Sequence, residues 1–341
     1  MTDKMNALIT LEDGFSGTSS GPAIESLDPY VKFGQVDVPD PGDGEVLVKV
    51  IMASINPSDL HFIKGEYGVP RRKGVPAGFE AVGVVEKAGK GGEHLVGKRV
   101  SCFGSASGVW AEYAIAAVPT CIPLRDDVRD EDAAAMLVNP LTAIGMYEEA
   151  ISMGSDAFIM TAAASQLCKL ISGLAKEDGK HAISIVRRDE QIEPLKAYGS
   201  SHVLNCKSDA FAKELEGLIK DLKPRVMLDA VADQTSAAIF TAMPARARWI
   251  IYGKLSTEMP AIEQPGQMIF MGKQIEGFWL TQWMKNKPVQ DQIAASMRVQ
   301  ELFATGTWKT DVAKVVKLED AHKEVPAALA GMNTGKVMLV P

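Results

Sequence analysis

Residues 157–177, AFIMTAAASQLCKLISGLAKE, join an apolar segment to an amphipathic one through a turn of small residues. Ala157–Ala162 is short and almost wholly apolar, which is typical of a strand buried on both faces of a parallel sheet. Gln166–Glu177 has the spacing of a helix and is followed by Gly179, a residue type that favours helix ends. A strand, a tight turn and a helix in this order predict the first unit of a doubly wound α/β sheet.

The same strand–helix alternation continues for about a hundred residues, a length that fits repeated βαβ units. Further strands are predicted at His181–Val186, His202–Asn205, Arg225–Val231 and Trp249–Gly253, and further helices at Phe211–Leu222 and Ser236–Ala245. The sequence therefore predicts an α/β fold built on a doubly wound parallel sheet.

The first third of the chain has the pattern of a β-rich domain. Glu45–Ser54 alternates in hydropathy after a turn rich in proline, glycine and aspartate. Short strand candidates follow at Ala81–Glu86, Arg99–Phe103 and Ala111–Ala116. Evenly spaced short strands are typical of a small barrel, so we expect one here.

The pattern becomes helical from Asp130 to Ala150, and the chain closes with a predicted strand at Lys336–Val340. We therefore expect three segments. Residues 1–126 form the β-rich domain, residues 127–270 form the nucleotide-type α/β domain, and residues 271–341 return to the first domain.

The composition indicates a globular protein that needs no disulfide or structural metal, with 341 residues, 46% of them hydrophobic. The net charge of -7 argues against a nucleic-acid or anionic-membrane partner, because both favour a basic face. The four cysteines (Cys102, Cys121, Cys168 and Cys206) are far apart, as in a reducing compartment. No presequence pattern is found at the N-terminus, so we expect a cytoplasmic protein.

The turn Thr161–Cys168 is the place where such a sheet binds the pyrophosphate of a dinucleotide. It consists of small residues, but the usual glycines are missing. Gln166 and Cys168 stand where close approach of the backbone favours glycine. The alternative is an alanine-rich turn that binds nothing.

Arg187 and Arg188 follow the second predicted strand, where an acidic residue would accept hydrogen bonds from the ribose of NAD. Two guanidinium groups suit a dianionic 2′-phosphate instead, so we expect NADPH rather than NADH as the cofactor. The alternative is a solvated basic pair at a strand end.

Several motifs together resemble those of one family over nearly the whole chain. They are Ile55-Asn56-Pro57-Ser58-Asp59, Gly65-Glu66-Tyr67-Gly68, Val138-Asn139-Pro140-Leu141-Thr142-Ala143, Tyr252-Gly253 and Gly277-Phe278-Trp279-Leu280-Thr281-Gln282-Trp283. The chain resembles the zinc-independent medium-chain dehydrogenases/reductases of the quinone oxidoreductase group, and within it the mitochondrial-type 2-enoyl thioester reductases. The resemblance implies a GroES-like β-rich catalytic domain and a Rossmann domain.

Two replacements predict that the chemistry needs no zinc. In alcohol dehydrogenases of this architecture, the catalytic zinc is bound by a cysteine in the loop that corresponds to Ile55–Asp59. It is also bound by a histidine in a Gly-His-Glu motif, which corresponds to Gly78-Phe79-Glu80 here. This chain has Asn56 and Phe79 at those positions, and it has no cysteine cluster for a structural zinc. His61 is a lone histidine, which is more often a packed residue than a ligand.

The resemblance also implies roles for individual residues. Tyr67 would be the catalytic residue near the substrate carbonyl, and the substrate would be bordered by Asn56, Tyr67, Trp279 and Trp283. The implied cofactor-binding residues are Asn139, Thr142, Thr161, Ser165, Gln166, Leu167, Cys168, Arg187, Arg188, Tyr252, Gly253, Lys254, Leu255, Phe278, Trp279, Leu280 and Lys336.

A neutral phenol suits the reduction of a double bond conjugated to a carbonyl. The reaction needs hydride at the β-carbon, stabilisation of an enolate oxygen and a proton for the α-carbon, and the hydroxyl of Tyr67 can supply the last two. The alternative is a loop tyrosine packed at the surface. Trp279 and Trp283, four residues apart, could equally form a packed core stripe or a wall for the substrate.

The leading hypothesis is NADPH-dependent reduction of a 2-enoyl thioester. A quinone or enone reductase is the nearest alternative, and a non-catalytic binder of nucleotide or RNA-like ligands is a third. Arg71-Arg72-Lys73 could receive an anionic carrier, although such a run is normally a solvated face. By analogy with the family we expect a homodimer, paired near Trp249–Gly253 and Met259–Gln267.

Overall fold

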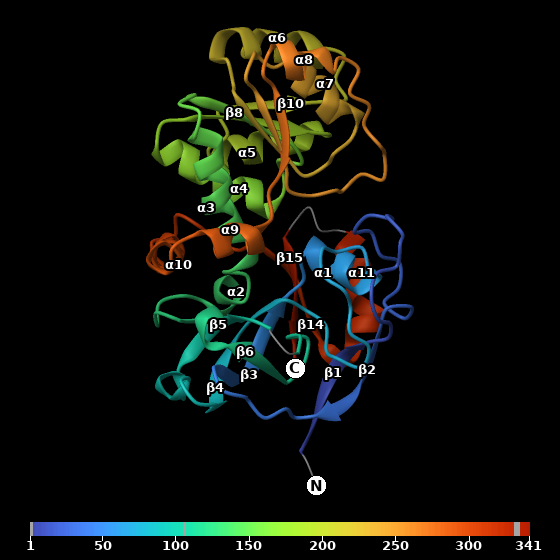
Figure 1. The fold of residues 1–341 in the computed structure, drawn as a ribbon, viewed down its shortest axis with the longest axis vertical. Helices are drawn as coiled ribbons and strands as arrows, with labels where there is room; N and C mark the ends of the chain where they lie inside the picture. The colour runs from blue at the N-terminus through green and yellow to red at the C-terminus, as the bar shows by residue number, and fades with distance from the viewer. Residues whose placement is uncertain (1–2, 105–106, 331–334) are drawn as a thin grey trace. The chain divides into compact units, whose positions relative to one another are not determined.

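The computed structural model describes residues 3–104, 107–330 and 335–341. The chain divides into two compact units, one formed by Met1–Asn139 with Ser296–Pro341 and the other by Pro140–Ala295 (Figure 1). These boundaries differ from those expected at residues 126/127 and 270/271. Residues 271–295 belong to the second unit, because a strand in this segment extends that unit's sheet, and residues 296–341 belong to the first unit.

The first unit is β-rich, with its strands at β1 (Lys4–Thr10), β2 (Val31–Asp37), β3 (Glu45–Ser54), β4 (Glu80–Ala88), β5 (Arg99–Phe103), β6 (Tyr113–Ala117), β7 (Cys121–Pro123), β14 (Val312–Lys317) and β15 (Lys336–Val340). Its helices are α1 (Pro57–Lys64), α2 (Asp130–Ala133) and α11 (Ala321–Ala330), and two more helices, α3 (Val138–Ile151) and α10 (Val289–Ala304), belong to both units. The main sheet has the order β14-β15-β3-β4-β5-β7, with β6 paired to β3, and β1 pairs with β2. The strand from the C-terminus thus joins a sheet built mainly by the first third of the chain.

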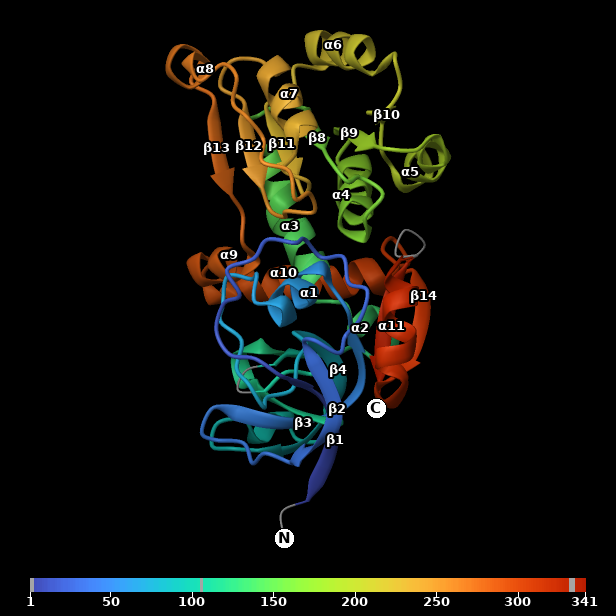
Figure 2. The ribbon, with the colours of Figure 1, turned by 90° about the vertical axis from the view of Figure 1, so that its right-hand side faces the viewer.

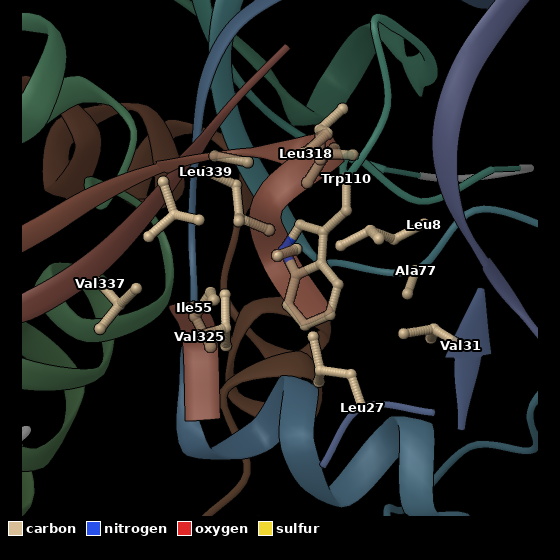
Figure 3. Packing of buried hydrophobic residues seen from close by; sticks show 14 of the residues in the cluster. Leu8, Leu27, Val31, Ile55, Ala77, Trp110, Leu318, Val325, Val337 and Leu339 are labelled. Atoms are coloured by element: carbon tan, nitrogen blue, oxygen red, sulfur yellow. The ribbon is translucent and has the colours of Figure 1, made fainter. Parts of the chain in front are cut away.

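The core of this unit packs around the indole of Trp110 (Figure 3). Its ring lies among apolar side chains from distant segments, including Leu8, Leu27 and Ile55. The indole Nε1 donates to the carbonyl of Ser54 at 3.3 Å. Because Ser54 and Ile55 are anchored in this core, the polar loop that follows β3 begins from a fixed point.

The second unit is a parallel sheet with the strand order β10-β9-β8-β11-β12-β13 (Figure 2). The strands are β8 (Ala157–Met160), β9 (His181–Val186), β10 (His202–Asn205), β11 (Val226–Asp229), β12 (Arg248–Ile251) and β13 (Gln274–Gly277). The helices are α4 (Gln166–Glu177), α5 (Ile192–Tyr198), α6 (Phe211–Leu222), α7 (Gln234–Ala242), α8 (Gly266–Phe270) and α9 (Leu280–Asn286). This order is that of a Rossmann sheet, so the predicted α/β fold is confirmed.

Several elements begin or end at other residues than predicted. The helical stretch from Asp130 to Ala150 is interrupted between α2 and α3. In this interval Glu80 accepts hydrogen bonds from the N–H groups of Leu137 and Val138. The strand expected at Ala111–Ala116 is β6, two residues later at its start. In the described part of the chain, no helix combines the length and apolarity needed to cross a membrane.

Candidate functional site

The carboxyl edge of the parallel sheet gathers many of the predicted cofactor residues. Thr161 directly follows β8, Arg187 follows β9, Tyr252 follows β12 and Phe278 follows β13. The register aligns these ends, because Leu228 of β11 pairs with Met160 and Ile251 pairs with both Asp229 and Gly277. The strand order reverses between β8 and β11, and ligands of such sheets bind at this position.

Asp229, at the end of β11, organises this edge from a fully buried position. Its Oδ2 accepts from the indole Nε1 of Trp249 at 2.8 Å and from the backbone N–H of Ala232 at 3.1 Å. Its Oδ1 accepts from the N–H of Val231 at 2.9 Å, from the Ser236 hydroxyl at 3.0 Å and from the Thr161 hydroxyl. A buried carboxylate is stable only when it is hydrogen-bonded, and here the bonds join β8, β11, β12 and α7.

The first strand–helix turn is held without the usual glycines. Ala162 adopts a left-handed conformation with φ of 48°, which is rare for a residue with a side chain. The N–H of Ala163 donates to the carbonyl of Ile185 at 3.2 Å, and Ser165 caps α4 by accepting from the N–H of Cys168 at 3.3 Å. These bonds keep the turn in a conformation that glycine would adopt more easily.

Cys168 points into the protein rather than toward a ligand. Its side chain is fully buried, and its Sγ lies 3.6 Å from the carbonyl of Thr161 and 3.4 Å from the hydroxyl of Tyr252. Burial raises the pKa of the Cys168 thiol, although hydrogen bonds with Ser165 and Tyr252 oppose this effect. The thiol therefore fills the space between helix and sheet, at a position where a phosphate-binding turn usually has glycine.

The remaining predicted residues of the sheet edge differ in exposure. Arg187 and Arg188 are exposed, and Arg188 forms an ion pair with Glu190 at 3.2 Å. The residues that are partly or largely covered are Thr142, Leu167, Gly253, Lys254, Phe278 and Leu280. Leu255 is exposed, and its N–H donates to the carbonyl of Ala230 at 2.9 Å, so the chain after β12 returns along the end of β11. Gln166 begins α4.

The two tryptophans predicted to share a helical face have different surroundings. Trp279 precedes α9 and is exposed, whereas Trp283 lies within α9 and is half-buried. Trp283 and Phe278 both pack on α3 at Gly145, where an added Cβ would lie 2.9 Å and 2.8 Å from their rings. Lys287 also lies over the Trp283 ring, 5.0 Å from its centre. Packing on α3 accounts for the position of Trp283.

In the first unit, a buried polar cluster follows β3. Glu80 is fully buried, and its Oε1 accepts from the Ser54 hydroxyl at 2.7 Å and from the Asn56 Nδ2 at 2.8 Å. Lys336, at the start of β15, donates from Nζ to the Asn56 Oδ1. Burial lowers the pKa of Lys336, and the charges of Glu80 and Asp59 act in the opposite direction. The structure thus brings the predicted residues Asn56 and Lys336 into direct contact.

Asp59 connects Asn56 and Phe79, the two residues on which the prediction of zinc-independent chemistry rests. Its Oδ2 accepts from the N–H of Asn56 at 2.7 Å, and its Oδ1 accepts from the N–H of Phe79 at 2.8 Å. Burial raises the pKa of Asp59 to about 7; its hydrogen bond from Asn56 works against this rise, and the charge of Glu80 adds to it. Among the described residues, no group of three or more His, Cys, Asp or Glu side chains could hold a metal ion.

Tyr67 lies in the loop between α1 and β4 and packs against Phe79, with ring centres 5.2 Å apart. Its neighbour Glu66 fastens this loop to the N-terminal segment, accepting from the Thr18 hydroxyl at 2.9 Å and from the Ser20 N–H and hydroxyl at 2.9 and 2.7 Å. Tyr67 is half-buried, so its ring is held by packing while part of it meets solvent. Asn139, the second residue of α3, is also half-buried.

Arg71, the first residue of the predicted basic run, is committed to the fold. It is buried, and its guanidinium donates to the carbonyls of Gly14, Ile63 and Asp13. Arg72 and Lys73 are exposed. The sequence hypothesis of a basic entrance made by all three residues is therefore wrong for Arg71.

Sequence reasoning missed Asp59, Glu80 and Asp229. A weak signal for Asp229 was present, because a carboxylate at the end of an apolar strand needs buried partners. Glu80 likewise begins a strand that is mainly apolar. Their partners come from distant segments, which periodicity does not reveal.

The fold and the site define a class: a protein with a Rossmann sheet of the kind that binds dinucleotides and a β-rich unit that carries candidate catalytic groups. Residues 42–126 match the family description of the alcohol dehydrogenase GroES-like domain. The mitochondrial enoyl-[acyl-carrier-protein] reductase of Dictyostelium discoideum is 32% identical over 258 residues, 71% of this chain and 71% of its own.

Solved structures of similar proteins point to the same family. A Mesorhizobium loti protein assigned as an NADPH:quinone reductase is 50% identical, with a TM-score of 0.95 over 100% of this chain and 99% of its own. A mycobacterial protein complexed with NADPH shares the fold at 23% identity, with a TM-score of 0.80 over 99% and 100%. The chain belongs to the medium-chain dehydrogenase/reductase family, in its group of NADPH-dependent quinone and enoyl reductases. The resemblance drawn from the motifs is confirmed.

Proposed function

We propose that this protein uses NADPH to reduce the activated C=C bond of a 2-enoyl thioester, with Tyr67 in place of a metal ion as the polarising group. The observation that carries the proposal is the packing of Tyr67 on Phe79, the residue that stands at a zinc-ligand position of metal-dependent relatives. A phenol held at this place can act on the carbonyl oxygen that a metal would otherwise polarise. The curated relatives named as enoyl reductases support the choice of substrate.

In the proposed reaction, the cofactor and the protein supply different groups. When bound, NADPH supplies the hydride that adds to the β-carbon and becomes NADP⁺. The hydroxyl of Tyr67 would donate a hydrogen bond to the thioester oxygen as negative charge develops there. The same hydroxyl would then give its proton to the α-carbon and regain one from solvent, which completes the saturated acyl product. Asn56 would border the substrate from the loop after β3.

The residues of the sheet edge fit the proposed cofactor. Arg187 and Arg188 are exposed at the end of β9, where the ribose of a dinucleotide lies in such sheets, and two guanidinium groups suit its 2′-phosphate. Gly253 lies so close to β11 that an added Cβ would come 3.1 Å from the carbonyl of Ala230. The capped N-terminus of α4 would face the pyrophosphate.

A quinone or enone reductase is the second candidate. The observation that favours it is the 50% identity to the Mesorhizobium loti protein assigned as an NADPH:quinone reductase. Quinones and enoyl thioesters share a carbonyl conjugated to a C=C bond, so the same hydride and phenol serve both.

One acceptor panel separates the candidates. NADPH oxidation is followed by its absorbance with crotonyl thioester, with a benzoquinone and without acceptor, for the wild type and for Tyr67→Phe. Tyr113→Phe is the matched control, because Tyr113 is a half-buried tyrosine on β6 of the same unit. We expect crotonyl turnover that falls roughly 100-fold in Tyr67→Phe only, as for loss of a general acid. Turnover of quinone alone would contradict the enoyl assignment, and NADPH binding without any turnover would favour a non-catalytic binder.

We also propose a homodimer, paired through the edge strand β13. The pairing expected near Trp249–Gly253 is corrected in this respect, because β12 lies between β11 and β13 and is not an edge strand. Ile275 lies exposed on β13, and the same unit carries further exposed apolar side chains that a partner would cover favourably, Met259, Ile269 and Phe270, of which Phe270 is 87% exposed. Sedimentation velocity of the wild type and of Ile275→Lys tests this. A monomeric wild type would contradict it.

The thiols support our proposal of a cytoplasmic location. Cys102, Cys121, Cys168 and Cys206 are all free, as expected in a reducing compartment. The Dictyostelium relative is mitochondrial. Imaging of the tagged chain in its own cells would decide the location.

A further inference from the structure

We propose that Glu80 is a positioning residue: it fixes the direction of the Asn56 amide and, through it, holds the Lys336 ammonium at the site. The inference rests on the proposed function, which assigns Asn56 to the substrate and Lys336 to NADPH. Glu80 itself contacts neither in this account. Its role is to decide which end of the Asn56 amide meets Lys336.

The contacts of Glu80 determine its orientation. Oε2 accepts from the backbone N–H of Leu137 at 2.9 Å and of Val138 at 2.8 Å. Oε1 accepts from the Ser54 hydroxyl at 2.7 Å and from the Asn56 Nδ2 at 2.8 Å. Every one of these partners donates, so Glu80 acts only as an acceptor, as an ionised carboxylate does.

The acceptor next to Asn56 forces the amide into one of its two orientations. The NH2 end faces Glu80 and also donates to the Ser54 hydroxyl at 3.1 Å. The oxygen end is then left for the Lys336 Nζ, which donates to it. The reverse orientation would place the NH2 against an ammonium and the oxygen against a carboxylate, so it is excluded electrostatically.

The same carboxylate also fixes the start of α3. The N–H groups at a helix N-terminus lack partners within the helix, and a negative charge is favourable there. Glu80 accepts from Leu137 and Val138, and Val138 directly precedes Asn139, another residue assigned to the cofactor. One buried side chain therefore fixes the positions of three segments that carry proposed site residues: the loop after β3, the start of α3 and, through Asn56, the start of β15.

Reversal of the polarity of this network gives a sharp test. In Glu80→Gln, the new amide oxygen can still accept from the two backbone N–H groups. The new NH2 group then lies against the NH2 group of Asn56, and neither can accept a hydrogen bond from the other. The Asn56 amide must then turn, which presents NH2 to Lys336. Asn56→Asp instead places two carboxylates face to face. In the double variant Glu80→Gln/Asn56→Asp, the introduced amide donates its NH2 to the introduced carboxylate and to Ser54, and that carboxylate still accepts from Lys336.

The readouts are the NADPH dissociation constant from fluorescence titration, kcat/KM for the acceptor that the wild type uses, and thermal unfolding. We expect each single variant to weaken NADPH binding roughly 10- to 100-fold, as for loss of a hydrogen bond to a charged group. The double variant should return to within about threefold of the wild type. Glu112→Gln is the matched control, because Glu112 accepts from Asn6 in the same unit, and it should leave binding unchanged.

Normal NADPH binding and kcat/KM in Glu80→Gln, with only a lower melting temperature, would overturn the inference. So would a double variant no better than the single ones. If Glu80→Gln alone fails to fold, the NADPH dissociation constant of the double variant is compared with that of Lys336→Met. Equally weak NADPH binding by these two variants would overturn the inference. The titration needs no acceptor, so an incorrect substrate class leaves this test intact. A wild type that binds no NADPH would instead refute the proposed function itself.

Discussion

The Sγ of Cys168 lies 3.4 Å from the hydroxyl of Tyr252, inside the interface between α4 and the parallel sheet. In the sequence, Cys168 stands where close approach of the backbone to a pyrophosphate favours glycine. The structure removes the side chain from the phosphate side of the turn, because the thiol is fully buried. The change from glycine thus alters packing rather than the surface that a pyrophosphate would meet.

Cys168→Gly should therefore affect stability more than cofactor binding. It removes a packed thiol and adds a flexible residue to the first turn of α4, which costs about 1 to 2 kcal/mol of unfolding free energy. The NADPH dissociation constant should stay within about threefold, measured beside urea denaturation. Binding that tightens about tenfold or more would show that the thiol obstructs the phosphates.

Arg188→Ala should raise KM for NADPH about 10-fold or more and leave KM for NADH nearly unchanged, because only NADPH carries the 2′-phosphate. Steady-state kinetics with both cofactors checks this. Lys213→Ala is the control, since Lys213 is an exposed cation on α6 of the same unit. Equal small changes with NADPH and NADH would remove Arg188 from the cofactor site.

Asp229→Asn should destabilise the second unit by roughly 2 to 4 kcal/mol, because an NH2 group would face donors that now meet a buried carboxylate. Thr161→Val removes one of those donors and also the acceptor of the Ala230 N–H at 3.1 Å, and should cost less, about 1 to 2 kcal/mol. Urea unfolding of both variants, with NADPH titration, measures the effect. An Asp229→Asn protein as stable as Thr161→Val would contradict the organising role of Asp229.

Asp59 makes the stability of the first unit depend on pH. Burial raises its pKa to about 7, so the folded protein keeps a proton that the unfolded chain loses near the ordinary pKa of 3.8. This contribution to stability is complete below pH 3.8 and is lost as the pH rises through 7. The melting temperature of Asp59→Asn minus that of the wild type should therefore increase between about pH 4 and pH 7.

Asp43→Asn is the control for this pH series, because Asp43 is exposed in the turn before β3. Its melting temperature relative to the wild type should not change in the same way. A pH-independent difference for Asp59→Asn would mean that Asp59 is ionised in the folded protein throughout the range.

The sheet of the second unit was predictable because it is local in sequence. Each strand from Ala157 to Ile251 is an apolar run flanked by a turn, and the order of such units in a doubly wound sheet is set by handedness. The pattern from Asp130 to Ala150 is helical, as predicted, but it forms two helices, α2 and α3. Between them, Glu80, far away in the chain, accepts from the N–H groups of Leu137 and Val138.

The site was only half predictable from the sequence. The family resemblance indicated Asn56, Tyr67 and Lys336, but it does not show that Asn56 and Lys336 touch. Asp59, Glu80 and Asp229 act through contacts between distant segments, and neither periodicity nor residue spacing encodes such contacts. The half-buried position of Trp283 likewise follows from its packing on α3 at Gly145.

The most direct test of the proposed reaction follows the hydride itself. The protein is incubated with NADPH deuterated at the transferring C4 position and with crotonyl thioester, and the product is examined by mass spectrometry and NMR. We predict a butyryl thioester that carries one deuterium on the β-carbon. Unchanged crotonyl thioester, in a preparation that oxidises the same NADPH with benzoquinone, would contradict the account.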